Sequence, residues 1–388
     1  MSHIKITLHK IMIFSVAGIL VCTSVFCIAI RIAESEIDPS FNLLAAELTM
    51  PAAITEYSQE QLLTSEQSDS VKNPETSTPA VTAESSETTD KKPENSEKTA
   101  SSQNQSTDFE YSIPSENELK KYDSEHKDEE QYPVREFNTT IGNQSYGNIQ
   151  MKNASSADID IKSELNAKLG FTIEDTDKPQ VLIYHTHTSE SFLKYDTGYF
   201  YESYYPRTTD PSANVCAVGE EITKQLNKVG IKTIHDTTVH DYPSYNGAYD
   251  RSYNTVSDYL EKYPSIKVVI DIHRDGIGTE TSKSKPIAEI DGKKAAQIMI
   301  LAGYNYDDDE TFQDWEYNLR FAMKIQNTAV DMYPDLMRPI YFADFMYNMN
   351  INTGSLLIEI GSESNTIEEV RYSGFLLGKV LSNTLKTH

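Results

Sequence analysis

The sequence predicts an α/β fold with a mostly parallel, twisted central sheet flanked by helices, on the basis of two observations. Apolar runs bounded by polar residues recur along the C-terminal part of the chain, at 180–187, 231–236, 266–273 and 354–361. Amphipathic segments with apolar residues every three or four positions lie between these runs. Strands that alternate with helices typically form a parallel sheet whose two faces are covered by the helices.

The first predicted strand, 180–187, reads QVLIYHTH and has the length and apolarity of a buried strand. A helix is predicted over 214–230, and Gly230 supplies its stop signal. A second strand, 231–236, follows directly. The apolar stripe of the helix consists of Val215, Val218, Ile222, Leu226 and Val229.

The second half of the predicted domain continues the alternation. A helix is expected over 249–263 and a third buried strand, IKVVIDIH, over 266–273. Asp291-Gly292 lies between two strand-like runs and predicts a type I′ hairpin. A long helix then carries Trp315, Leu319, Ala322, Ile325 and Ala329 on one stripe. The buried strand 354–361 and a last helix with Val370, Leu377, Val380 and Leu381 complete the pattern.

The N-terminal third has a different character. Residues 11–30 carry no charge and, as a helix, would span about 30 Å, the hydrocarbon thickness of a bilayer. We therefore predict a transmembrane helix over 11–31, after a basic cytoplasmic tail over 1–10 that places the remainder outside the cytoplasm. A cleaved signal peptide is the alternative. Residues 32–135 are predicted as a stalk and disordered linker, and 136–388 as the folded α/β domain.

Composition limits the possible partners and metal ligands. The net charge of −25 argues against a nucleic-acid partner, which would require a basic face. Two of the three cysteines, Cys22 and Cys27, lie in the apolar N-terminal run. Cys216 alone cannot form an intramolecular disulfide or a cysteine-based zinc site. A metal site is therefore expected to use histidine and carboxylate, with Cys216 in the core.

Polar side chains stand at the ends of three predicted strands. His185 and His187 end the first, His273 ends the third, and Glu359 lies in the last. In open α/β sheets, ligands bind at the carboxyl ends of strands. Two histidines and one carboxylate leave a zinc coordination position open for water, as catalytic zinc sites do.

Each signal has an ordinary structural explanation as well. A histidine at a strand end is often only a hydrogen-bonded structural residue, and Glu190 could cap the segment that follows it. His185 and His187 should leave the strand on one face. We prefer His187 as the metal ligand. We expect His185 to orient a metal ligand through a hydrogen bond, without contacting the metal itself.

Four motifs in order carry a family resemblance: VLIYHTHTSESF, TVHDYPSYNGAYDRS, SIKVVIDIHRDG and LLIEIGSESN. They are similar to the catalytic domain of the stage II sporulation protein P family of endospore-forming bacteria, over about residues 178–386. That family in turn resembles zinc-dependent N-acetylmuramoyl-L-alanine amidases. The resemblance implies Zn²⁺ bound by His187 and His273, and Glu359 as the catalytic base.

The third ligand departs from the amidase pattern, because no glutamate opens the helix at 214. The nearest replacement is Glu190, with Glu202 and His185 as alternatives. Arg274 could stabilise the developing oxyanion, or pair structurally with Asp275. The resemblance also implies endopeptidase action on stem-peptide cross-links during engulfment, at the membrane between mother cell and forespore.

The implied partners are peptidoglycan, stage II sporulation protein D and a polytopic sporulation membrane protein. Two other functions stay open on the residues alone. One is a non-catalytic wall-binding scaffold, and the other is a metal-dependent deacetylase of wall sugars.

Overall fold

The computed structural model describes residues 109–306 and 309–387. The predicted cytoplasmic tail (1–10), the predicted transmembrane helix (11–31) and residues 32–108 of the predicted linker lie outside these ranges. Within them, no helix is both long enough and apolar enough to cross a bilayer.

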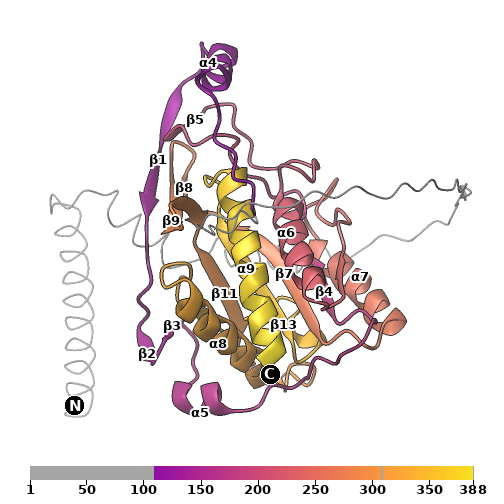
Figure 1. The fold of residues 1–388 in the computed structure, drawn as a ribbon. Coiled ribbons are helices and arrows are strands. Elements are labelled where there is room, and N and C mark those ends of the chain that lie inside the picture. The colour runs from indigo at the N-terminus through magenta and orange to yellow at the C-terminus, as the bar shows by residue number, and fades with distance from the viewer. Residues whose placement is uncertain (1–108, 307–308, 388) are drawn as a thin grey trace, which may run out of the picture. The chain divides into compact units, whose positions relative to one another are not determined.

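The central feature is a sheet of eight strands that confirms the predicted α/β class (Figure 1). Of the seven pairings among these described strands, five are parallel; β2 with β3 and β11 with β13 are antiparallel. In spatial order the strands are β2 (Gln144–Tyr146), β3 (Ile149–Asn153), β12 (Ile340–Ala343), β11 (Ile298–Gly303), β13 (Ser355–Ser362), β7 (Val268–Asp275), β4 (Val181–Tyr184) and β6 (Thr233–His235).

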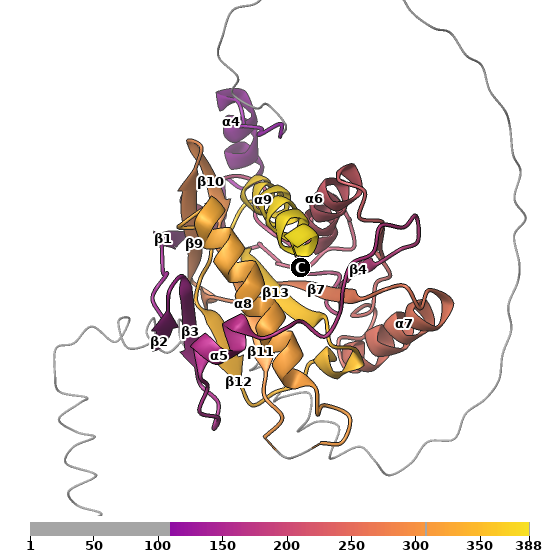
Figure 2. The ribbon, with the colours of Figure 1, turned by 60° about the horizontal axis from the view of Figure 1, so that its bottom comes forward.

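Both faces of this sheet are covered, which explains why its central strands β11, β13, β7 and β4 are buried along their whole length. Helices α6 (Val215–Lys228), α8 (Trp315–Met332), α9 (Ile367–Thr387) and the short α5 (Ile161–Asn166) contribute to one large core cluster. Helix α7 (Ala248–Lys262) packs on the opposite face through Val256, against Leu182 and Tyr184 of β4. Figure 2 shows α6, α8 and α9 gathered together and α7 apart from them.

A smaller second sheet has the order β10-β9-β1-β5, with β8 paired to β9. Its strands are β1 (Gln131–Phe137), β5 (Tyr199–Tyr201), β8 (Gly278–Thr279), β9 (Ser282–Ile290) and β10 (Lys293–Ala296). The predicted hairpin at Asp291-Gly292 joins β9 to β10, and both turn residues have positive φ, as a type I′ turn requires.

The start of the described chain is more structured than its composition indicates. The predicted domain boundary at residue 136 falls inside β1, which pairs in parallel with β9 and antiparallel with β5. Helix α4 (Glu116–Glu125) precedes it and begins with a capping box between Ser115 and Glu118. A 3₁₀ helix, η1 (Met349–Ile351), leads into β13.

Candidate active site

The site begins where β4 ends at Tyr184 and the chain turns sharply. Thr186 fixes this turn, since its main-chain N–H and its hydroxyl donate to the two carboxylate oxygens of Asp271 on β7 (2.8 and 2.6 Å). The N–H of Glu190 then donates to the carbonyl oxygen of His187 (3.0 Å). All residues from His185 to Glu190 are buried.

Strand alternation sets the direction of the side chains on β7 and β13. Ile272 and Ile358 face the core beneath α6, α8 and α9. His273 and Glu359 therefore face the opposite side, where α7 lies. Their Cα atoms are register partners in the parallel pairing of β7 with β13, so the two side chains lie beside each other.

The turn after β4 brings His187 and Glu190 to the same place. The rings of His187 and His273 are perpendicular, with centroids 5.4 Å apart. Nδ1 of His273 is 3.7 Å from Oε2 of Glu190, which also accepts a hydrogen bond from the main-chain N–H of Arg274 (3.1 Å). The structure thus brings together His187, Glu190, His273 and Glu359, all four of which the sequence singled out.

Several acceptor and donor atoms of this group are buried without a hydrogen-bond partner. They are Nδ1 of His187, Nδ1 of His273 and both carboxylate oxygens of Glu359. Buried polar atoms nearly always have a partner in folded proteins, and those that lack one often mark a bound ion or a catalytic role. Nδ1 of His187 lies 4.0 Å from the carboxylate of Asp241, whereas the atoms of His273 and Glu359 point to a group that completes the site.

The surroundings shift the pKa values of the titratable groups in the site in different directions. Burial and the neighbouring His273 hold the pKa of His187 well below its usual value, so His187 is neutral. Burial also acts to lower the pKa of His273, but the carboxylate of Asp271, 3.0 Å from its Nε2, overcomes this and raises that pKa to about 9. Burial, with the charge of Asp275, raises the pKa of Glu359 well above its usual range.

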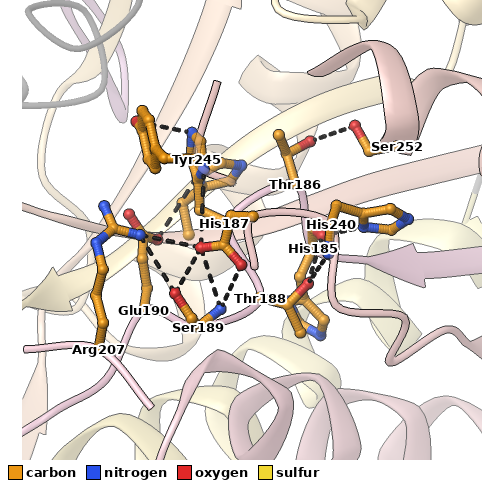
Figure 3. A network of polar contacts seen from close by, with 12 residues as sticks. His185, Thr186, His187, Thr188, Ser189, Glu190, Arg207, His240, Tyr245 and Ser252 are labelled. Atoms are coloured by element: carbon orange, nitrogen blue, oxygen red, sulfur yellow. Dashed lines mark hydrogen bonds and ion pairs between the residues drawn. The ribbon is translucent and has the colours of Figure 1, made fainter. Parts of the chain in front are cut away.

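Loop residues that the sequence did not single out surround His187 (Figure 3). Asp241 is fully buried, accepts hydrogen bonds from Ser189 and from Arg207 (3.0 Å), and lies 4.0 Å from Nδ1 of His187. The hydroxyl of Tyr245 lies 3.1 Å from Nε2 of the same histidine. These residues come from irregular segments, and only the motif that contains Asp241 and Tyr245 hinted at them.

Two alternatives for the third ligand fall outside the group. Glu202 is exposed, just beyond β5. His185 was expected to orient a metal ligand through a hydrogen bond, and that expectation is wrong. Its Nδ1 donates to the carbonyl oxygen of Ile272 (3.0 Å) and its Nε2 meets Nε2 of His235 (2.9 Å). Because β4 ends at Tyr184, the turn rotates His187 to the other side of the sheet.

Arg274 is held by its surroundings. Its guanidinium donates to the carbonyl oxygens of Asp275 and Pro206 and lies 3.5 Å from the carboxylate of Glu363. The carboxylate of Asp275 pairs with Arg338 (2.8 Å). Arg274 thus contacts Asp275 through the main-chain carbonyl oxygen, while the Asp275 carboxylate pairs with Arg338.

Cysteine also enters the set of potential metal ligands. Among the described residues, two groups place one donor atom from each of three side chains within 4.8 Å of one another: His185, Cys216 and His235, and Glu136, Asp196 and Glu369. The group of His187, Glu190 and His273 is looser. The expectation that a metal site would use only histidine and carboxylate overlooked a mixed set, because Cys216 meets two histidines that are distant in sequence.

The fold and the site define an α/β protein with histidines and carboxylates gathered at the carboxyl ends of parallel strands. The chain belongs to the stage II sporulation protein P family, whose model matches residues 41–382, and this confirms the resemblance carried by the four motifs. A stage II sporulation protein P from Bacillus subtilis (strain 168) is 28% identical over 223 residues, 53% of this chain and 51% of that protein. The chain thus spans about half the length of this curated relative.

Solved structures that resemble the chain include several N-acetylmuramoyl-L-alanine amidases. AmiC2 of Nostoc punctiforme is 9% identical, with a TM-score of 0.32 over 55% of this chain and 98% of that one. An amidase from Clostridium difficile 630 is 17% identical, with a TM-score of 0.31 over 55% and 97%. The CwlD amidase of Clostridioides difficile, solved with the GerS lipoprotein, is 12% identical, with a TM-score of 0.31 over 54% and 100%.

Proposed function

We propose that the chain is a membrane-anchored, zinc-dependent N-acetylmuramoyl-L-alanine amidase that is also an endopeptidase on stem-peptide cross-links. The observation that carries the proposal is the convergence of His187, Glu190, His273 and Glu359 at one edge of the sheet, with buried atoms that lack partners. Membership of the sporulation family supports a role in septal wall thinning and engulfment.

The residues present fit a zinc ion. His187, Glu190 and His273 would hold it, two neutral nitrogens and a carboxylate being a donor set typical of catalytic zinc. Asp271 beside His273 fits as the carboxylate that orients a ligand histidine. Zinc, when bound, supplies a Lewis acid for the scissile carbonyl and lowers the pKa of water.

Glu359 is the proton carrier in this proposal. It would accept a proton from the attacking water as the C–O bond forms, and deliver that proton to the stem-peptide nitrogen as the C–N bond breaks. Burial raises the pKa of this carboxyl, which favours the form that holds the proton between the two steps. Both of its oxygens are available for this, since neither has a hydrogen-bond partner.

Arg274 contributes first through its main chain, because its N–H orients the carboxylate of Glu190. The oxyanion role predicted for its guanidinium remains a prediction, and the contacts to Pro206 and Glu363 would have to rearrange to allow it.

The proposed location is the cell membrane, with a single pass at 11–31, the N-terminus in the cytoplasm and the catalytic domain in the space between mother-cell and forespore membranes. Stage II sporulation protein D and a polytopic sporulation membrane protein are the proposed partners. The basis for both proposals is the apolar segment and the family.

The test is incubation of the full-length protein, in detergent, with purified peptidoglycan before and after treatment with a chelator. Mass spectrometry of the soluble products should find free stem peptides that disappear with chelator and return with added zinc. Absence of chelator-sensitive stem peptides would refute the amidase.

The same digest distinguishes the other functions. A wall-sugar deacetylase leaves glycan and peptide joined but shifts their mass by loss of acetyl groups. A non-catalytic scaffold releases nothing, and Glu359→Gln leaves its wall binding unchanged. Endopeptidase action would convert cross-linked stem peptides into monomers.

A further inference from the structure

We propose that Cys216, His185 and His235 form a second metal site, separate from the proposed catalytic centre and suited to Zn²⁺. Their donor atoms, Sγ of Cys216 and a ring nitrogen of each histidine, all lie within 4.8 Å of one another. The three side chains come from helix α6, the end of β4 and the end of β6, so one ion would join three elements.

The site lies on the other face of the sheet from His187, His273 and Glu359. Ile183 of β4 faces α6, and His185, two residues further on, continues to that side and meets His235. The proposed catalytic residues face α7. The two sites therefore share no side chain.

The hydrogen bonds of His185 prepare its Nε2 to bind a cation. Its Nδ1 contacts the carbonyl oxygen of Ile272 (3.0 Å), which can only accept, so Nδ1 carries the hydrogen and the Nε2 of the neutral ring carries a lone pair.

The contacts of His235 likewise leave a lone pair on its Nε2. Its Nδ1 lies 3.6 Å from the carboxylate of Glu220, which favours a hydrogen on Nδ1. Its Nε2 would then also carry a lone pair, yet it lies only 2.9 Å from Nε2 of His185. Two facing lone pairs repel unless a cation lies between them. Ligand histidines commonly show this pattern, with the distal N–H held by a carbonyl or carboxylate.

Helix α6 leaves room for the two rings at Gly219, one turn after Cys216. A Cβ atom placed there would lie 2.5 Å from Nε2 of His235 and 3.0 Å from Nε2 of His185. Only glycine therefore lets both nitrogens approach the helix beside the thiol.

The ligand set and the access route favour zinc. Thiolate with imidazole is a common zinc set, with Zn–N about 2.0 Å and Zn–S about 2.3 Å. Tetrahedral bonding to both rings needs the two Nε2 atoms about 3.3 Å apart, a few tenths of an ångström wider than found. Cys216 and His235 line a cavity of about 420 Å³ that also includes Glu220, from which a water or that carboxylate would complete the coordination.

Burial raises the pKa of the Cys216 thiol to about 12 when no metal is present. Binding would deprotonate the thiol, as metal coordination does, and release one proton to solvent.

Cobalt substitution tests the site, because thiolate–Co²⁺ charge transfer gives a near-ultraviolet band that histidine and carboxylate ligands do not give. The parent is the full-length protein with Cys22→Ser and Cys27→Ser, which leaves Cys216 as its single thiol. We expect the band in the parent, its loss in Cys216→Ser, and its weakening in His235→Asn and Gly219→Ala. His126→Asn, in the segment after α4, is the matched control and should leave it unchanged.

A second measurement needs no variant of the site itself. X-ray absorption of the zinc-loaded parent should show a sulfur neighbour at about 2.3 Å. Absence of both the charge-transfer band and the sulfur neighbour would overturn the proposal and leave a proton shared by His185 and His235.

The proposed catalytic site can be tested independently of the proposed second metal site. In His187→Ala the charge-transfer band should persist while stem-peptide release is lost. In Cys216→Ser the protein should keep its stem-peptide release and bind one zinc equivalent fewer.

Discussion

The phenol ring of Tyr245 lies flat on the imidazole of His187, with centroids 4.5 Å apart and planes inclined by only 6°. Its hydroxyl is 3.1 Å from Nε2 of that histidine, and the guanidinium of Arg207 lies over the tyrosine ring at 4.8 Å. His187 is only 1% exposed as a result. A molecule that approaches Nε2 of His187 from the side of Tyr245 must move that ring.

The first prediction concerns the Tyr245 hydroxyl. Because Asp241 faces Nδ1 of His187, we assign Nε2 as the metal-binding atom, and the hydroxyl then competes for it. Removing one hydrogen bond of about 0.5–1.5 kcal/mol should raise zinc affinity about two- to tenfold in Tyr245→Phe. Competition with a chromophoric chelator measures this, with the exposed Tyr205→Phe as control. Equal affinities in the two variants would contradict the assignment of Nε2.

The second prediction concerns Glu359. Replacement by glutamine keeps the shape but removes the proton carrier, so stem-peptide release should fall by about 10²–10⁴-fold. Glu289→Gln, at an exposed position on β9, is the control and should retain full activity. Full activity in Glu359→Gln would remove this residue from the chemistry.

Glu359→Gln should also stabilise the metal-free protein, in a pH-dependent way. Burial raises the pKa of Glu359 in the folded state, so above its ordinary value of about 4.3 the unfolded state loses this proton more readily and unfolding is favoured. The gain in unfolding free energy of the variant should therefore grow as the pH rises from about 4. Urea denaturation at several pH values measures it, and a gain that shrinks with pH would contradict the sign.

A third prediction links zinc affinity to His273. Since the pKa of His273 is raised to about 9, zinc must displace a proton below that pH. All proteins compared carry Cys216→Ser, which removes the proposed second site. Their zinc affinity should rise about tenfold per pH unit between about pH 7 and 9 and then level off.

Asp271→Asn is the matched variant for this titration. Loss of the carboxylate lowers the pKa of His273, so the levelling should move to lower pH, and affinity at pH 9 should fall about 10–100-fold. An identical pH profile in both proteins would show that His273 is not a ligand.

The fourth prediction concerns stability and uses two lysines that share acidic neighbours. Lys285 and Lys294 each contact Glu136 and Asp196, but their side chains are 2% and 41% exposed. Lys285 alone also pairs with the buried Glu369 (2.7 Å). Lys285→Met should cost about 3–5 kcal/mol of unfolding free energy, because it leaves Glu369 without its cation.

Lys294→Met should cost about 1 kcal/mol or less, because its partners are screened by water. Chemical denaturation measures both variants. Equal losses would show that burial does not set the strength of this network.

Much of this fold could be predicted from the sequence because its central strands are buried on both faces. Such strands read as apolar runs, and their carboxyl ends collect His273, Glu359 and the turn after Tyr184 at one edge. Strand β1 of the smaller sheet was missed, because its residues are exposed or only partly buried and it reads as polar. The prediction that His185 and His187 share a face was wrong, since alternation holds only while the chain remains a strand, and the turn after Tyr184 carries His187 to the side of Tyr249.

Asp241, Tyr245 and Arg207 could not have been ranked from the sequence alone. They lie in segments without regular periodicity, and their meeting with His187 depends on long-range packing. The mixed group of Cys216, His185 and His235 has the same origin, because its members are separated by 19 or more positions in the chain.

The pairing of His273 with Glu359 through the register of β7 and β13 has a consequence for how the family can vary in length. The two side chains are neighbours because backbone ladders align them, without a direct bond between them. A one-residue insertion or deletion within either strand would turn one of them to the opposite face. Length changes should therefore accumulate in the loops, and the interiors of these two strands should change only by substitution.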